Sequence, residues 1–282
     1  MNVARTLAEL RTLRANLPEP LGLVPTMGAL HEGHLSLVRR AKADCSSVGV
    51  SLFVNPAQFG ANEDLASYPR DVERDLRMLE AEQVDVVWTP EVSEVYPPGF
   101  QTWVTVEEIT QLLEGARRPG HFRGVATVVA KLFNAFQPWR AYFGQKDAQQ
   151  VLVIKRMAAD LDFPIDVVVC PTVREPEGLA MSSRNVYLKP AERRAATVLF
   201  RALTAAKASF EGGEHDAGRL REILRGVLNA EPLAEIAYVS VADPSTLAEE
   251  SGKIRSGLLS LAVRFGKTML IDNILVGEQE DG

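Results

Sequence analysis

The sequence predicts an α/β protein, with a Rossmann-like, doubly wound parallel sheet followed by a smaller C-terminal α+β domain. Two observations favour this fold class. Up to residue 175, short apolar runs alternate with helix-like patterns, which is typical of βαβ units with right-handed crossovers. Beyond that point the pattern changes to long helices and then to strands joined by short turns. With 282 residues, of which 46% are hydrophobic, the chain can bury a sizeable core.

The first domain is expected to span residues 1–175. A short apolar run at 21–25 ends at a turn and predicts a strand, and apolar residues at helical spacing predict a helix at 33–43. The run VGVSLFV at 48–54 is apolar almost throughout, as expected for a strand that is covered on both faces. The remaining patterns predict helices at 64–82, 124–136 and 148–160, and strands at 84–88 and 165–170.

The second domain is expected to span residues 176–282. Its patterns predict a long Ala/Arg-rich helix at 190–210, a helix at 220–228, and strands at 236–241, 257–263 and 268–273. The tripeptide Phe265-Gly266-Lys267 suits a hairpin between the last two strands. This mixture is typical of an α+β domain.

Composition narrows the class of protein. The formal net charge of −6 argues against a nucleic-acid partner held by bulk electrostatics. The cysteines, Cys45 and Cys170, form no CxxC motif, so a reducing compartment is expected. The N-terminal segment has no apolar signal-peptide core, and the sequence has no apolar run of membrane-spanning length. We therefore expect a cytoplasmic protein with neither a nucleic-acid nor a membrane partner.

The segment LVPTMGALHEGHLSLV contains two histidines, His31 and His34, where the first strand passes into the first helix. A zinc pair is one interpretation, but zinc usually takes three or four ligands, and the spacing is not HExxH. The other histidines, His121 and His215, lie far away in the sequence, and the cysteines lie in apolar contexts. We therefore predict no protein-bound metal at this motif.

A phosphate site is the stronger interpretation of this motif. Ligands of doubly wound sheets bind at the carboxyl ends of strands, and a helix N-terminus attracts anions. Gly28 would let the turn approach a ligand closely, and Gly33 would leave room for a nucleotide. His31 and His34 could then donate hydrogen bonds to phosphate oxygens. Other nucleotide motifs fail, since no GxGxxG follows the strand and Leu261 stands where a P-loop needs its first glycine.

Five stretches resemble the pantoate–β-alanine ligase (pantothenate synthetase) family. They are PTMGALHEGHLSLV, FVNPAQFG, RPGHFRGV, YFGQKDAQQ and PTVREPEGLAMSSRNVYL, in order over residues 21–190, and the later LIDNI is also similar. HxGH alone marks only the wider nucleotidylyltransferase superfamily, so another member of that superfamily is the alternative. FVNPAQF and GQKDAQQ together are much more specific.

The resemblance implies an ATP-dependent ligation of D-pantoate to β-alanine through pantoyl adenylate, with AMP and pyrophosphate as products. ATP is then a substrate, and Mg²⁺ would bridge its phosphates with few protein ligands. Asp75 is a candidate ligand only. The resemblance also implies a homodimer, and a C-terminal lid hinged near residues 175–178.

The resemblance assigns roles residue by residue. His34 would be the proton donor, His31 would contact the phosphates, and Lys146 would neutralise charge on the α-phosphate. The residues assigned to ATP are Met27, Gly28, Ala29, Leu30, His31, Glu32, Gly33, His34, Gly144, Gln145, Lys146, Asp147, Val173, Met181, Ser182, Ser183 and Arg184. Residues 181–184 are similar to a phosphate loop, for which an ordinary Ser/Thr turn is the alternative.

Substrate contacts are expected from amide side chains. Gln58 and Gln150 would hold pantoate, and Gln58 would also meet β-alanine, because an amide both donates and accepts hydrogen bonds. Asn55 either joins them or only orders its turn, while Arg118 and His121 could line the site. Gln145 departs from the family, which usually carries glutamate there, so a role for that carboxylate is in doubt.

Overall fold

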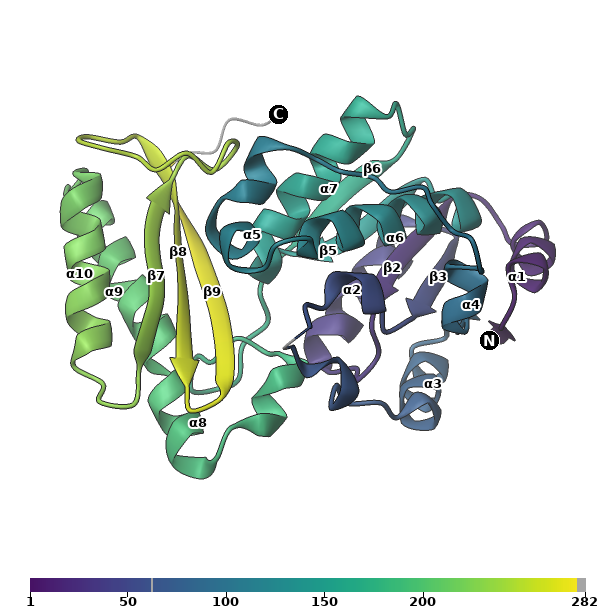
Figure 1. Cartoon of the computed structure of the whole chain (residues 1–282), viewed down its shortest axis with the longest axis horizontal. Coiled ribbons are helices and arrows are strands. Elements are labelled where there is room, and N and C mark those ends of the chain that lie inside the picture. The colour runs from purple at the N-terminus through teal and green to yellow at the C-terminus, as the bar shows by residue number, and fades with distance from the viewer. Residues whose placement is uncertain (62, 278–282) are drawn as a thin grey trace. The chain divides into compact units, whose positions relative to one another are not determined.

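The computed structural model describes residues 1–61 and 63–277, which form two compact units (Figure 1). The first unit comprises Met1–Gln145 and Gln149–Pro171. The second comprises Lys146–Ala148 and the described residues from Thr172 to Gly277. In the described part of the chain, no helix is long and apolar enough to cross a membrane.

A six-stranded sheet organises the first unit, and every strand pairs in parallel with its neighbours. In chain order the strands are β1 (Asn2–Ala4), β2 (Leu21–Thr26), β3 (Ser47–Leu52), β4 (Val86–Trp88), β5 (Arg140–Gly144) and β6 (Asp166–Cys170). Their spatial order is β1-β4-β3-β2-β5-β6. The strand order therefore reverses between β2 and β5, which is where doubly wound sheets bind ligands. The predicted fold class is confirmed.

Helices cover both faces of this sheet. They are α1 (Leu7–Arg14), α2 (Glu32–Asp44), α3 (Val72–Ala81), α4 (Val92–Val95), α5 (Leu113–Arg117), α6 (His121–Phe136) and α7 (Ala148–Asp160). One buried cluster joins α6 and α7 to strand residues such as Leu23 and Phe143. A second cluster joins α2 and α3 to Val24 and Tyr142. Successive strand residues thus face opposite cores, which explains the continuously apolar runs in the sequence.

The second unit contains an antiparallel sheet of three strands, β7 (Glu235–Ala242), β8 (Ser256–Phe265) and β9 (Thr268–Gly277). Its helices are α8 (Pro190–Ala196), α9 (Val198–Glu211) and α10 (Ala217–Asn229). α9 and α10 bury their apolar side chains against one sheet face, on which Leu261 and Val263 lie. Phe265 pairs with Thr268, so the predicted hairpin turn at Gly266-Lys267 is confirmed.

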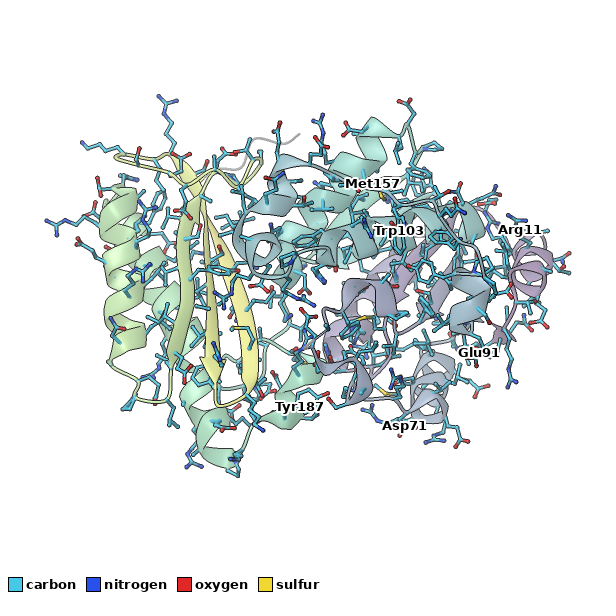
Figure 2. The ribbon with its side chains drawn as sticks, viewed as in Figure 1. Arg11, Asp71, Glu91, Trp103, Met157 and Tyr187 are labelled. Carbon is cyan, nitrogen blue, oxygen red and sulfur yellow. The ribbon has the colours of Figure 1, made fainter. Side chains whose placement is uncertain are left out.

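Two predicted helices are wrong in extent. The segment predicted as one helix at 64–82 contains a short 3₁₀ helix, η2 (Asp64–Ala66), and α3 begins only at Val72. Pro69 disfavours helical backbone at the residue before it. Asp71, which is labelled in Figure 2, caps the new helix by accepting a hydrogen bond from the Arg74 N–H at 3.0 Å.

The helix predicted at 190–210 is divided at Thr197, between α8 and α9. Its hydroxyl donates to the Arg194 carbonyl at 2.8 Å, a local bond that competes with the helical pattern. The N-terminal β1 and α1 were not predicted. Their signals are short: three strand residues at the sheet edge, and a capping box formed by Thr6 and Glu9.

Candidate active site

The turn after β2 lies at the point where the strand order reverses. Thr26 ends the strand, where its hydroxyl donates to the Ser51 carbonyl at 2.8 Å and accepts from the Gly28 N–H at 3.2 Å. Gly28 has a φ of 78°, and a Cβ there would lie 3.0 Å from an oxygen of Asp75. Ala29 also has a positive φ, 51°. This backbone is uncommon for a residue other than glycine and needs support from outside the turn.

Asp75 supplies that support from α3. Its side chain is buried, and its two oxygens accept hydrogen bonds from the Ala29 N–H at 2.8 Å and the Leu30 N–H at 2.9 Å. Burial raises the pKa of Asp75 above its ordinary value, although the two backbone hydrogen bonds oppose this shift. Because both oxygens bind the turn, Asp75 is better suited to shape the turn than to bind a metal, the role considered from sequence.

His31 and His34 both cap the helix α2. Nδ1 of His31 accepts from the Gly33 N–H at 3.1 Å, and Nδ1 of His34 accepts from the His31 N–H at 3.3 Å. Their ring centroids lie 4.1 Å apart. A neutral imidazole whose Nδ1 accepts carries its proton on Nε2, so capping makes each Nε2 a donor. Helix capping and phosphate recognition are therefore compatible functions of the two histidines.

A buried polar network orients Gln58 at the end of η1 (Pro56–Gln58). Asn55 donates to the Gln58 side-chain oxygen at 3.0 Å and to the Gly124 carbonyl at 3.1 Å. The Asn55 oxygen accepts from the Tyr96 hydroxyl at 2.8 Å. The Gln58 amide nitrogen lies 3.2 Å from the Met27 sulfur. Gln58 is thus linked to the turn of the HxGH motif, with its oxygen engaged by Asn55 and its NH₂ group on the side of Met27.

Tyr96 and Gly124 explain the rigidity of this network. Burial raises the pKa of Tyr96, with the hydrogen bond to Asn55 opposing it, so the phenol stays protonated and donates. A Cβ on Gly124 would lie only 2.2 Å from the Ala57 carbonyl oxygen, so only glycine lets α6 pack this closely against η1.

Arg118 and His121 also contact this region. Arg118 binds both carboxylate oxygens of Glu63, at 2.7 and 2.6 Å. Its guanidinium lies 3.1 Å from Nε2 of His121, whose Nδ1 lies 2.8 Å from the Gln58 carbonyl oxygen. Burial alone would raise the pKa of Glu63, but hydrogen bonding and attraction from Arg118 lower it overall. The structure thus gives Arg118 a structural partner beside Gln58.

Lys146 follows β5, the strand that neighbours β2 across the reversal point. Gly144 ends β5, and Gln145, Lys146 and Asp147 form the 3₁₀ helix η4 (Gln145–Asp147). The Lys146 ammonium lies 3.2 Å from an Asp147 carboxylate oxygen. The Lys146 carbonyl accepts from the Asn273 side chain at 2.8 Å, a contact within the second unit. Gln150 lies in the first turn of α7.

The segment from Val173 to Arg184 lies in the second unit. The Met181 N–H donates to the Val173 carbonyl at 3.0 Å. Ser182 caps the 3₁₀ helix η5 (Ser183–Tyr187) by accepting a hydrogen bond from the Arg184 N–H at 3.3 Å. Tyr187, the last residue of η5, is labelled in Figure 2. The ordinary Ser/Thr turn that was the alternative to a phosphate loop is therefore present. This turn also keeps the hydroxyls of Ser182 and Ser183 close in the chain to the guanidinium of Arg184.

Some residues with structural roles at these sites were missed from sequence. Asp75 was seen only as a possible metal ligand, and Tyr96, Glu63 and Asn273 were not assigned. Their partners are distant in the chain, so no local spacing reveals them. Over the described residues, no group of three or more His, Cys, Asp or Glu side chains could hold a metal ion.

Comparison with known proteins decides the family. A family model described as pantoate-beta-alanine ligase matches residues 2–275. The chain belongs to the pantoate-beta-alanine ligase family. A relative named pantothenate synthetase, from Roseiflexus sp. (strain RS-1), is 62% identical over 276 residues, which cover 98% of this chain and 99% of the relative.

Solved structures of pantoate-beta-alanine ligases have the same fold. The pantothenate synthetase from Thermus thermophilus is similar with a TM-score of 0.94 and 49% identity, covering 99% of this chain and 100% of the other. The pantoate-beta-alanine ligase from Francisella tularensis, complexed with beta-gamma ATP and beta-alanine, has a TM-score of 0.81 and 34% identity, covering 98% and 97% of the two chains.

Proposed function

We propose that this protein joins D-pantoate to β-alanine with ATP, through a pantoyl-adenylate intermediate, and releases AMP and pyrophosphate. Membership of the ligase family over residues 2–275 supports this reaction. The observation that carries the assignment to this site is the turn after β2, where two capping histidines present Nε2 donors at the sheet reversal point.

The first step needs charge stabilisation more than a base. A pantoate carboxylate is already ionised near neutral pH and attacks the α-phosphorus directly, displacing pyrophosphate. The N–H groups and dipole of α2, with His31 and His34, stabilise the negative charge on the phosphates. His34 acts as the proton donor, and Lys146 neutralises charge on the α-phosphate. In the second step the β-alanine amine attacks the acyl carbon and AMP leaves.

Residues 27–34 bind the nucleotide. Gly144 and Asp147 contact the ribose hydroxyls, Gln145 lies in the same nucleotide-binding segment without an assigned ribose or phosphate contact, and Val173 offers its backbone to adenine. Met181, Ser182, Ser183 and Arg184 bind the β- and γ-phosphates, because hydroxyl and guanidinium donors suit phosphate oxygens.

Gln58 and Gln150 hold pantoate, and Gln58 also meets β-alanine. Since Asn55 engages the Gln58 oxygen, Gln58 offers its NH₂ group to a substrate oxygen. The orientation of one amide thus favours an acceptor, such as a hydroxyl or carboxylate oxygen of pantoate, over a donor at this position.

Mg²⁺ accompanies ATP in this proposal. Magnesium commonly takes most of its ligands from substrate oxygens and water, so we expect the ATP phosphates to hold it when it is bound. When bound, Mg²⁺ reduces the charge on the phosphates. The chain's own cations, Lys146 and Arg184, add to that neutralisation.

The proposal extends to the whole chain. Residues 1–175 bind nucleotide and pantoate, and residues 176–282 act as a lid that excludes water from the adenylate. The protein works in the cytoplasm as a homodimer. Chemical crosslinking and sedimentation test the dimer, and protease protection of residues 172–180 by ATP and pantoate tests the lid.

The reaction is tested by following AMP and pantothenate in the presence of ATP, Mg²⁺, D-pantoate and β-alanine. We expect equal amounts of both products, and multiple turnovers only when every substrate is present. A product that retains the adenylyl group, formed without release of free AMP, would instead indicate another HxGH nucleotidylyltransferase reaction.

A further inference from the structure

The LIDN segment of β9 contains two consecutive buried polar residues, Asp272 and Asn273. Successive strand residues point to opposite sheet faces. Asp272 shares its face with Leu270 and Val276, which belong to the core under the helices. Asn273 therefore lies on the other face, where its side-chain NH₂ donates to the Lys146 carbonyl at 2.8 Å.

Asp272 holds this part of the strand in place. Its carboxylate accepts two hydrogen bonds from the Arg174 guanidinium, at 2.5 and 2.9 Å, and one from the Asn273 N–H at 2.8 Å. Buried charges in proteins are stable when they are paired and hydrogen-bonded in this way. The Asn273 backbone is thus fixed by a charge on the neighbouring residue.

Arg174 is fixed in turn. It donates to the Gly178 carbonyl at 3.1 Å, and its guanidinium lies 4.2 Å from the centre of the Phe200 ring. A continuous set of contacts therefore runs from Arg174 through Asp272 and Asn273 to the main chain of Lys146. All of these residues belong to the second unit.

We propose that Asn273 is a positioning residue for Lys146, anchored by the Asp272–Arg174 ion pair. This inference rests on the role of Lys146 given above. Lysine has a flexible side chain, so the direction of its ammonium depends on where its main chain is held. The contacts at both ends of Lys146, with Asn273 at the carbonyl and Asp147 at the ammonium, limit that direction. Displacement of a catalytic group by about 1 Å lowers rates about 100-fold.

Asn273→Asp is the most direct variant, because the ionised carboxylate has nearly the same shape and cannot donate to a carbonyl. Ser260→Ala is the matched control. Ser260 pairs with Asn273 in the sheet, and its buried hydroxyl has no hydrogen-bond partner among the described residues. The readout is the rate of pyrophosphate release from ATP and pantoate in a single turnover, together with KM for each substrate and the unfolding midpoint.

We expect Asn273→Asp to slow this step about 10- to 100-fold, with KM values within about twofold of the parent. Ser260→Ala should retain the parent rate. If Asn273→Asp does not fold, Asn273→Ser takes its place, since a serine hydroxyl is too short to reach the carbonyl. A rate for the folded Asn273 variant equal to that of Ser260→Ala would overturn the inference.

Combination with Lys146→Ala separates positioning from a general structural effect. If Asn273 acts through Lys146, Asn273→Asp should have little further effect on the rate in the Lys146→Ala variant, which has no lysine side chain to position. Equal fold losses in both backgrounds would contradict the proposed link. Full activity of Lys146→Ala by itself would instead refute the role of Lys146, so the two failures are distinguishable.

Discussion

The turn of the HxGH motif and the turn that carries Lys146 are stabilised in different ways. His31 and His34 cap their own helix through bonds that span two or three residues. The Lys146 carbonyl instead depends on Asn273, 127 positions later. The short motif supplies both partners of each histidine cap, whereas the Lys146 contact exists only after the sheet of the second unit has formed. Substitutions should therefore affect the two turns differently.

We expect the largest loss of stability from breaking the Arg174–Asp272 ion pair, which anchors Asn273 and through it the turn that carries Lys146. Asp272→Ala removes one partner of a buried pair and leaves the Arg174 guanidinium without its carboxylate. We expect a loss of about 3–5 kcal/mol in the free energy of unfolding, measured by urea denaturation. Glu222→Ala, in the exposed pair with Arg219, is the control and should not change stability measurably. Equal stability of the Asp272 variant and the parent would show that this pair does not hold the turn.

The HxGH turn can be tested by separating its two functions. An asparagine in place of His34 would keep an acceptor near the position of Nδ1, so His34→Asn should preserve the helix cap but lose the Nε2 donor. We expect a fall in kcat of about 100- to 1,000-fold, with an unfolding midpoint close to that of the parent. His215→Ala, which removes a histidine outside the site, should leave kcat unchanged. Normal turnover by His34→Asn would mean that this histidine is only a helix cap.

Much of the fold and part of the site follow from the sequence. The parallel sheet is predictable because buried strands such as 48–54 carry a continuous apolar signal. The helix caps of His31 and His34 are predictable because their partners are local. The predicted helix at 64–82 is too long, since its helical periodicity outweighs the signal of Pro69. Asp75 and Asn273 could not be assigned because each acts on backbone that only the folded chain brings near.

Substitution of Asp75 tests the turn of the HxGH motif with a smaller expected effect. Asp75→Asn replaces one acceptor oxygen by an NH₂ group that faces a backbone N–H. We expect a loss of about 1–3 kcal/mol in stability, partly offset because a buried charge is removed, and a higher KM for ATP. Glu73→Gln, on the exposed side of the same helix, is the control. An unchanged KM for ATP would show that the turn keeps its shape without Asp75.

The smallest expected effect concerns pH and the Arg118–Glu63 pair beside Gln58. Arg118 lowers the pKa of Glu63 in the folded state below its ordinary 4.5. The ionised pair therefore adds stability above pH 4.5, and this contribution is lost as the pH falls through the lowered pKa. Glu63→Gln should make the free energy of unfolding less dependent on pH in this acid range. The same pH dependence in both proteins would contradict a stabilising role for the pair.

Adenylate formation at the turn of the HxGH motif is tested most directly by mixing a known concentration of protein with an excess of ATP, Mg²⁺ and D-pantoate, without β-alanine. We expect about one equivalent of pyrophosphate per site and a bound acyl adenylate, which added β-alanine converts to pantothenate and AMP. The first phase should be lost in His34→Asn. If no pyrophosphate forms until β-alanine is added, a separate adenylation step at this turn is contradicted.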